Sequence, residues 1–132
     1  MNKKRALVGL HNPANLKYTS LLMKAEGFKV TKARTLDEML QAMGVLTTGS
    51  GCAMPKNLFT HYFMDVNLGS PNSKYYSPAQ RVYDLVKSHV ESGEAKFSSA
   101  SNNFQTVKLA RAAGIPVYFG HEESLRILLE EI

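Results

Sequence analysis

The sequence predicts an α/β fold in which a parallel five-stranded sheet carries helices on both faces. Two observations predict it. Short apolar or β-branched runs alternate with longer segments of helical apolar spacing, and this pair repeats five times within 132 residues. Alternation of this kind builds parallel sheets that helices cover on both sides. The hydrophobic share of 44% is ordinary for a globular chain, so we expect one domain over residues 1–132.

The first strand is predicted at residues 4–10, and a helix signal follows it directly. Asn12 can cap a helix whose first residue is Pro13, because the first turn leaves its N–H groups unpaired in any case. Gly27 ends this helix, since glycine accepts the left-handed backbone of a C-terminal cap. The predicted inner face consists of apolar residues at helical spacing: Ala14, Tyr18, Leu21, Leu22 and Ala25.

The second unit begins with a shorter and more polar strand at residues 28–33, which is typical of a sheet edge. Thr35 and Glu38 form a capping box that opens the next helix, and Gly44 closes it. The apolar face of that helix is predicted to contain Leu36, Met39, Leu40 and Met43.

The third unit contains the central strand, predicted at roughly residues 58–64, and this aromatic-rich run ends in the carboxylate of Asp65. Ser77 and Pro78 then start a long helix, with Ser77 as its cap, and Gly93 ends it. The inner face of the helix is predicted to contain Ala79, Val82, Tyr83, Val86 and Val90.

The last two units follow the same pattern. A short strand at residues 95–100 leads to Asn102 and Asn103, which can cap a helix that Gly114 ends. The final strand, at residues 115–119, has a proline near its start, as only an edge strand tolerates easily. The inner faces of the two helices are predicted to contain Phe104, Val107, Ala110 and Ala113, then Leu125, Leu128, Leu129 and Ile132.

Two long loops interrupt these units. Residues 45–57 are rich in Gly, Ser and Thr, show no period and hold the single cysteine, Cys52, which we expect to be a reduced thiol. Residues 66–77 leave Asp65 and carry Tyr75 and Tyr76, whose rings we expect to be exposed, either as a surface insertion or as a partner contact or lid.

Five strand–helix units of this size predict a flavodoxin-like arrangement, a three-layer (βα)5 fold with strand order 2-1-3-4-5. Sites in such folds lie at the carboxyl ends of the strands. A carboxylate, hydroxyls and imidazoles are expected to meet at that edge. The residues that follow the strands there are Leu10, His11, Asn12, Asp65, Ser98, Ser99, Gly120 and His121.

At this point the chain resembles the receiver domain of two-component response regulators, over essentially its whole length. The resemblance rests on the five units, on residues 63–68 (FMDVNL) in the place of the phosphoacceptor motif, on Ser99-Ala100, and on the spacing from Gly114 to Tyr118. It implies that Asp65 is the phosphoacceptor. It also implies that Ser99 is the switch hydroxyl and that Tyr118 is the switch aromatic.

Two features of the family are substituted in this sequence. The acidic pair that holds Mg²⁺ falls on Leu10 and His11, with Asn12 following, although Mg²⁺ requires hard oxygen ligands. The lysine after the fifth strand falls on His121. Because phosphoryl transfer depends on cations that neutralise the phosphoryl oxygens, we expect weak or no phosphorylation of Asp65. No cofactor is expected, and Mg²⁺ would be needed only if phosphorylation is retained.

The resemblance therefore favours a stand-alone, atypical receiver without enzymatic activity that acts by binding another protein. The expected partner is a histidine kinase or a downstream effector, and a homodimer is a further option. The family's interaction face is formed by the fourth helix, fifth strand and fifth helix. In this chain that face would include Val107, Arg111, Tyr118 and Leu125.

Two alternatives stay open. In one, Asp65 is phosphorylated conventionally, with a protonated His121 in place of the lysine and Asn12 lending an oxygen to a weakly held metal. In the other, His11, Asp65 and His121 converge as a transition-metal site, since two imidazoles and one carboxylate suit Zn²⁺, Ni²⁺ or Fe²⁺.

Charge and hydropathy narrow the class of partner. The net charge is +5, and eight of the basic residues lie within residues 1–35, where Glu26 is the one acid. No nucleic-acid-binding motif accompanies them, so nucleic acid is not the expected partner. No apolar run approaches the length of a membrane span, which argues against a membrane protein and for a cytoplasmic one.

Overall fold

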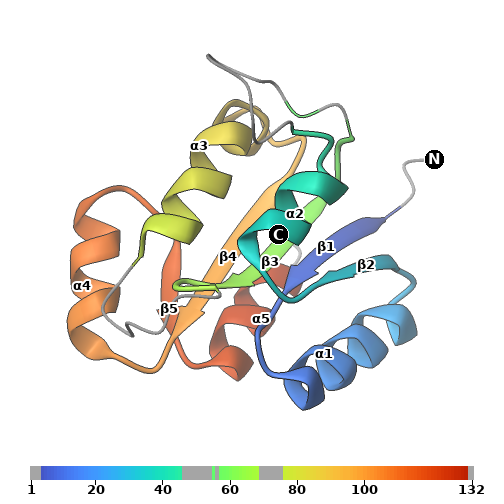
Figure 1. The fold of residues 1–132 in the computed structure, drawn as a ribbon, viewed down its shortest axis with the longest axis horizontal. Coiled ribbons are helices and arrows are strands. Elements are labelled where there is room, and N and C mark those ends of the chain that lie inside the picture. Colours follow the sequence, from blue (N-terminus) through green and yellow to red (C-terminus); the bar gives the residue numbers. More distant parts are fainter. Residues whose placement is uncertain (1–3, 46–54, 56, 69–75, 131–132) are drawn as a thin grey trace.

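The computed structural model describes residues 4–45, 55, 57–68 and 76–130, and its ribbon is drawn in Figure 1. Five strands form one sheet of order β2-β1-β3-β4-β5, and every neighbouring pair is parallel, which confirms the predicted fold. The elements are β1 (Arg5–Gly9), α1 (Pro13–Ala25), β2 (Lys29–Ala33), α2 (Leu36–Ala42), β3 (His61–Asp65), α3 (Ser77–Glu91), β4 (Lys96–Ser101), α4 (Phe104–Ala112), β5 (Val117–Phe119) and α5 (His121–Leu129).

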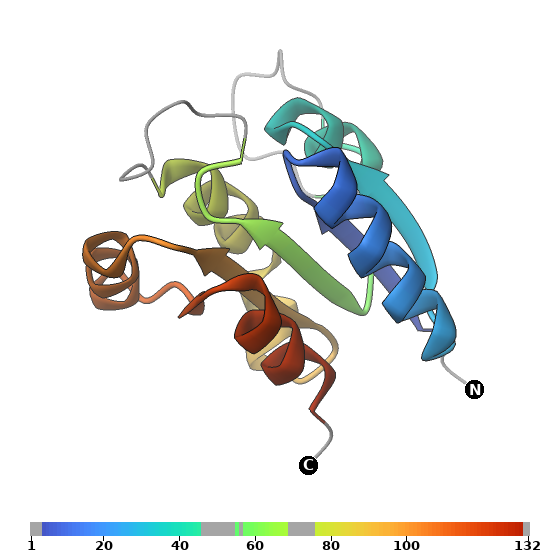
Figure 2. The ribbon, with the colours of Figure 1, turned by 90° about the horizontal axis from the view of Figure 1, so that it is seen from below.

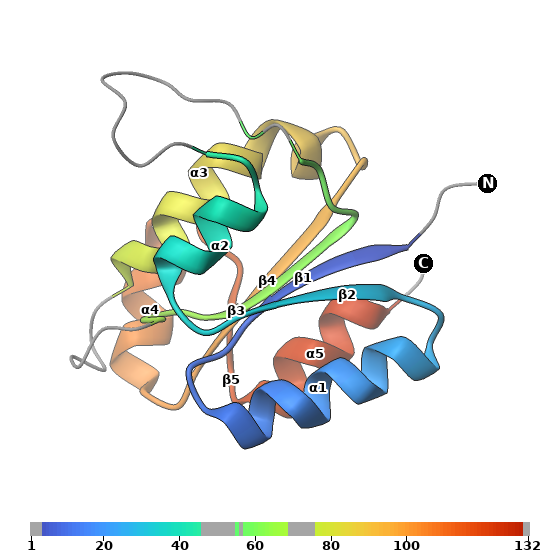
Figure 3. The same cartoon turned by 45° about the vertical axis from the view of Figure 1, so that its right-hand side comes forward.

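The helices form two layers around the sheet. Figures 2 and 3 show α1 and α5 on one face and α2, α3 and α4 on the other. Alternate side chains of a strand point to opposite faces, and the buried residues accordingly form two clusters. Tyr62 and Met64 of β3 belong to the cluster beneath α2 and α3, whereas Phe63 belongs to the cluster beneath α1 and α5. Burial raises the pKa of the Tyr62 phenol, whose oxygen accepts a hydrogen bond from the Phe59 N–H.

The strand register brings the predicted site residues to one edge. Gly9 pairs with Met64, and Asp65 pairs with Ala100, so β1, β3 and β4 end at the same level of the sheet. Because parallel strands share one carboxyl edge, the segments that follow these strands lie together there.

Three of the predicted helix caps are confirmed. The side chains of Asn12, Thr35 and Asn103 each accept a hydrogen bond from a backbone N–H in the first turn of α1, α2 and α4. The cap predicted at Ser77 is wrong, because Ser77 is already the first residue of α3 and Tyr76 precedes it without a side-chain hydrogen bond. Pro78 alone is sufficient to favour a helix start in this segment.

The predicted stop signals are correct, and some boundaries differ. Glycines with positive φ follow α1, α2, α3 and α4, as the left-handed cap requires. The central strand begins at His61 rather than residue 58, and Leu58 is 43% exposed. Tyr76 packs against the core instead of lying exposed. Cys52, Tyr75 and Ile132 lie outside the described residues, as do most of the two predicted loops.

The predicted inner face of α1 is wrong, and Phe104 of α4, also predicted to face inward, is 70% exposed. Tyr18 and Leu21 are exposed, whereas the buried residues of the helix are Leu16, Thr19, Ser20 and Met23. The apolar spacing that identified the helix therefore belongs to its outer side. The helix itself was still predicted correctly, because periodicity identifies a helix without showing which stripe faces the core.

Gly9 allows α2 to approach the sheet next to the carboxyl edge. A Cβ built on Gly9 would lie 2.3 Å from Met39 Sδ and 2.9 Å from Leu68 Cδ2. Met39 and Leu68 are both buried, and Leu68 lies three residues after Asp65. The missing side chain therefore makes room for two core residues that support the segment following β3.

We predict that Gly9→Ala destabilises the protein by about 1–3 kcal/mol, because the added methyl group overpacks this contact. Chemical denaturation measures the effect. In a Met39→Ala background the same change should cost clearly less, since the nearest atom is gone. Equal costs in the two backgrounds would show that Met39 is not the obstacle.

Candidate functional site

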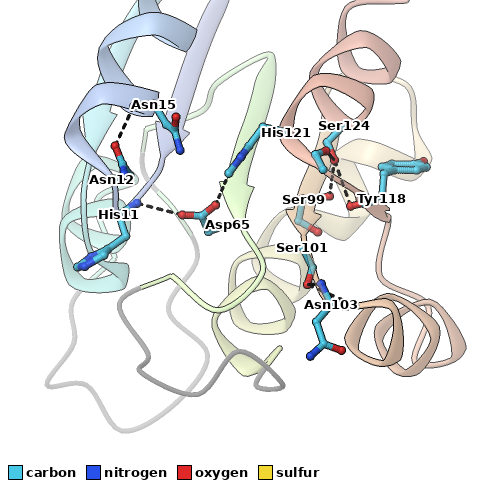
Figure 4. A network of polar contacts seen from close by, with 11 residues as sticks. His11, Asn12, Asn15, Asp65, Ser99, Ser101, Asn103, Tyr118, His121 and Ser124 are labelled. Carbon is cyan, nitrogen blue, oxygen red and sulfur yellow. Dashed lines mark hydrogen bonds and ion pairs between the residues drawn. The ribbon is translucent and has the colours of Figure 1, made fainter.

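A pocket of about 490 Å³ opens at the carboxyl edge of the sheet. It lies where the segments after β1, β3, β4 and β5 meet, and Figure 4 shows its polar contacts. The described lining residues are polar except for Ala100, and Asp65 is the one carboxylate among them. The lining residues are His11, Asn12, Asn15, Asp65, Asn67, Ala100, Ser101, Asn102, Asn103 and His121.

Asp65 is held from two sides. Its Oδ1 lies 2.6 Å from Nε2 of His121, and its Oδ2 accepts a hydrogen bond from the backbone N–H of His11 at 3.0 Å. The Asp65 side chain is 17% exposed and that of His121 is 31% exposed. An ionised carboxylate only accepts hydrogen bonds, so Nε2 of His121 must carry the proton in this pair.

The backbone fixes His121 in this place. His121 is the first residue of α5, and Gly120 before it has φ of 85°, a conformation that favours glycine. The Gly120 N–H donates to the Ser101 carbonyl, which ties the start of α5 to the end of β4. The hydroxyl of Ser124, one turn on, donates to the Gly120 carbonyl at 2.7 Å. The imidazole therefore approaches Asp65 from a well-anchored helix start.

The predicted transition-metal set does not form. His11 contributes its backbone, and its side chain is exposed and directed away from Asp65 (Figure 4). The Arg34 guanidinium also holds the His11 carbonyl, with both N–H···O distances at 3.2 Å. Within the part of the chain that the structure describes, no three His, Cys, Asp or Glu side chains are grouped to hold a metal ion.

The positions of the family's acidic pair do not supply oxygen ligands. Leu10 is fully buried in the core beneath α1 and α5. Asn12 uses its Oδ1 to cap α1, accepting from the N–H groups of Ala14 and Asn15 at 2.9 and 3.1 Å. Mg²⁺ binds several hard oxygens in near-octahedral geometry, so these residues do not fit that ion.

Ser99 is not at the pocket. It is fully buried, two residues before the end of β4, and its hydroxyl donates to the Pro116 carbonyl at 2.8 Å. Ser98 is also buried, and its hydroxyl donates to the Ser124 carbonyl. The hydroxyl residue that lines the pocket is Ser101. β4 extends one residue beyond the predicted end, so Ser99 lies within the strand and not at the pocket. Its role as the switch hydroxyl stays a prediction.

Comparison with solved structures identifies the fold. A response regulator protein from Burkholderia pseudomallei, whose structure holds a phosphorylated aspartic acid, a calcium ion and citrate, matches 96% of this chain at 18% identity with a TM-score of 0.66. The non-phosphorylated HemR receiver domain from Leptospira biflexa matches 96% of it at 17% identity with a TM-score of 0.60. This chain has a receiver-domain fold.

The extent of the match differs between the two proteins. This chain covers 66% of the length of the Burkholderia chain and 91% of the length of the Leptospira chain. No protein-family model matches this sequence, and no curated protein matches it either. Among the described residues, no helix is both long and apolar enough to cross a bilayer.

Tyr118 lies on the α4 side of this receiver fold. It pairs with Ala100 in the β4–β5 register. The centroid of its ring lies 5.0 Å from the guanidinium carbon of Arg111. Arg111 also donates from Nε to the Val117 carbonyl at 2.8 Å. The aromatic ring is thus half-buried under an arginine that the β5 backbone holds in place.

Sequence reasoning missed the amide character of the site. Asn15, Asn67, Asn102 and Asn103 all line the pocket, together with Ser101. The signal was visible as a recurrence of asparagine after three predicted strands, but Asn102 and Asn103 were interpreted only as helix caps and Asn15 was not considered.

We predict that neutral His121 is the Nε2–H tautomer, with Nδ1 unprotonated, because Asp65 accepts from Nε2. Long-range ¹H–¹⁵N correlation spectra distinguish the tautomers. In Asp65→Ala the two tautomers should approach the populations of an unrestrained imidazole, whereas His89 on α3 serves as an unaffected control in the same spectra. A proton on Nδ1 of His121 in the wild-type protein, with bare Nε2, would contradict the pairing.

Proposed function

We propose that this chain is a receiver module of two-component signalling that acts through protein–protein interaction, with weak or no phosphorylation of Asp65. One observation carries the proposal. Both carboxylate oxygens of Asp65 already have hydrogen-bond partners, His121 Nε2 and the His11 N–H. The partner we expect is a histidine kinase or a downstream effector in the cytoplasm, and we expect no catalytic activity of the chain itself.

The contacts of Asp65 oppose its use as a nucleophile. A hydrogen bond lowers the nucleophilicity of the oxygen that accepts it, and an attacking oxygen must share the site with the charge of a phosphoryl group. Receivers neutralise that charge with a divalent ion and a lysine, and here Leu10 is buried, Asn12 caps α1 and His121 is bound to the nucleophile itself. A single well-placed charge stabiliser contributes orders of magnitude in rate, so the loss of two predicts very slow phosphorylation.

A conventionally phosphorylated receiver is the second candidate. The Burkholderia protein of the same fold carries a phosphorylated aspartic acid, which favours this function for Asp65 at the end of β3. A protonated His121 would then have to leave Asp65 and contact the phosphoryl oxygens instead. The two candidate functions make opposite predictions for the phosphorylation of Asp65 in the wild-type chain.

We predict that the wild-type chain gains no phosphate, or only a trace, when incubated with phosphoramidate and Mg²⁺ and examined by intact mass. The variant His121→Lys should gain about tenfold more, because it frees Asp65 from the imidazole and supplies an ammonium group for the phosphoryl oxygens. The gain should disappear when Asp65→Asn is added.

The matched control is His89→Lys, which places the same ammonium group on α3, outside the pocket lining. It should behave like the wild type. A full phosphate on the wild-type chain that is lost in Asp65→Asn would contradict the proposal and establish the second candidate.

The interaction surface we propose is the exposed part of α4 and β5. Phe104 and Phe119 are 70% and 43% exposed and stack with ring centroids 4.2 Å apart, and Leu109 is 49% exposed. The face predicted from the sequence was partly wrong, because Val107 and Leu125 are each only 9% exposed and face the core. An exposed aromatic pair is a characteristic anchor of protein interfaces.

We predict that a photo-reactive amino acid in place of Phe104 forms a cross-link to a protein partner in living cells of the source organism. The same amino acid in place of Leu58, which is exposed at 43% just before β3, should not form that cross-link. Mass spectrometry of the product identifies the partner. Identical products at the two positions, or none at position 104, would count against this surface.

A further inference from the structure

The two edges of the sheet differ in how far their backbone is covered, and the edge formed by β5 is closed. β5 has three residues, and Pro116 directly before it lacks an N–H group. The Pro116 carbonyl accepts from the Ser99 N–H of β4, so the next carbonyl, that of Val117, points outward. Arg111 covers it, donating from Nε at 2.8 Å. Short length, proline and covered backbone groups keep an edge strand from pairing with another chain.

β2 forms the other edge of the sheet, and its outer side is open (Figure 1). It has five residues, contains no proline and pairs with β1 alone. The Lys29 N–H donates to the Lys4 carbonyl, and the Ala33 carbonyl accepts from the segment after β1. Because successive backbone groups alternate between the two sides of a strand, the N–H and C=O groups of Val30 and Lys32 point away from β1. Each of these two residues therefore offers a donor and an acceptor to a further strand.

The charge along β2 indicates which kind of strand fits. Lys29 and Lys32 are both exposed, and their odd spacing places them on opposite faces of the sheet. Glu26 is the one acid among the first 35 residues, which include eight basic ones. The next acids along the chain belong to the first turn of α2. A strand added beside β2 therefore meets a lysine on each of its two faces.

A second copy of this chain does not fit the open edge. Pairing of β2 with β2 would bring the lysines of the two strands together, and like charges on neighbouring strands are destabilising. Lysine on an edge strand is accordingly a device against self-pairing. The same two charges attract a strand that carries carboxylates. The edge thus discriminates by charge between a second copy and an acidic segment.

We infer that β2 binds an acidic, extended segment of another protein, which adds to the sheet as a further strand. Main-chain hydrogen bonds to Val30 and Lys32 supply affinity, and ion pairs with Lys29 and Lys32 supply selectivity. The inference goes beyond the proposed function. It is independent of the chemistry at Asp65, and β2 lies at the edge of the sheet opposite to β5 and the surface proposed there.

Amide hydrogen exchange followed by ¹H–¹⁵N NMR tests the inference, with a short synthetic peptide of alternating valine and glutamate as the probe. In the free chain the N–H groups of Val30 and Lys32 should exchange faster than that of Lys29, which is bonded to the Lys4 carbonyl. Saturating peptide should slow exchange at Val30 and Lys32 about tenfold or more, because a paired strand protects the backbone and ion pairs alone do not. The same peptide with lysine in place of glutamate should have no effect.

Two variants at one position separate backbone pairing from charge. Lys32→Pro removes the outward N–H group and should abolish peptide binding, because an edge position whose N–H faces outward tolerates proline without losing the pairing with β1. Lys32→Gln is the matched control. It removes the same charge, keeps the N–H group and should weaken binding only a few-fold. Circular dichroism confirms that both variants fold.

Charge reversal tests the selectivity without a change in the backbone. The pair Lys29→Glu, Lys32→Glu should weaken peptide binding about tenfold, since two attractions become repulsions. The pair Lys87→Glu, Lys108→Glu makes the same change at exposed positions of α3 and α4 and should leave binding unchanged.

Several results would overturn the inference. One is a wild-type chain in which Val30 and Lys32 stay unprotected at millimolar peptide. Others are equal binding of the lysine peptide, or equal weakening by the two charge-reversal pairs. Protection that grows with protein concentration in the absence of peptide would show that a second copy occupies the edge instead, and it would overturn the inference as well.

Discussion

The hydrogen bonds to Asp65 are the interaction on which the arrangement of the functional edge depends. One carboxylate joins three segments that are distant in the sequence: the end of β3, the backbone that leaves β1, and the start of α5. Because Asp65 is only 17% exposed, its charge requires these partners, and removing either would leave a carboxylate poorly solvated. The two carboxylate oxygens of Asp65 therefore hold together three segments of the carboxyl edge.

The surroundings of Asp65 are consistent with this fixed state. Gly120, Ser101 and Ser124 hold the start of α5 through backbone and hydroxyl bonds, which fixes the backbone position of His121. Asn12 and Asn103 direct their side-chain oxygens to helix caps and not into the pocket. The oxygens of Asp65, Asn12 and Asn103 are thus used in local structure.

The fold was predictable from the sequence because several local signals agreed. Apolar spacing located all five units, glycine stops ended four of the helices and capping residues began three of them, and parallel pairing followed from the alternation. The site was less predictable. Backbone geometry at the sheet edge decides that His11 meets Asp65 through its N–H group and not through its side chain. It also decides that β4 ends at Ser101 and not at Ser99. Spacing alone does not carry that information, since a shift of one or two residues changes which side chain reaches the pocket.

The error at α1 has a different cause. Apolar periodicity was present, and it was assigned to the core because most amphipathic helices bury their apolar stripe. In α1 the core accepts Leu16 and Met23 with two small hydroxyl residues between them, which lets the helix lie close to the sheet. Tyr18, Leu21 and Leu22 are then left outside. Periodicity therefore locates a helix, whereas the size of the residues that fit against the sheet decides which side of the helix faces the core.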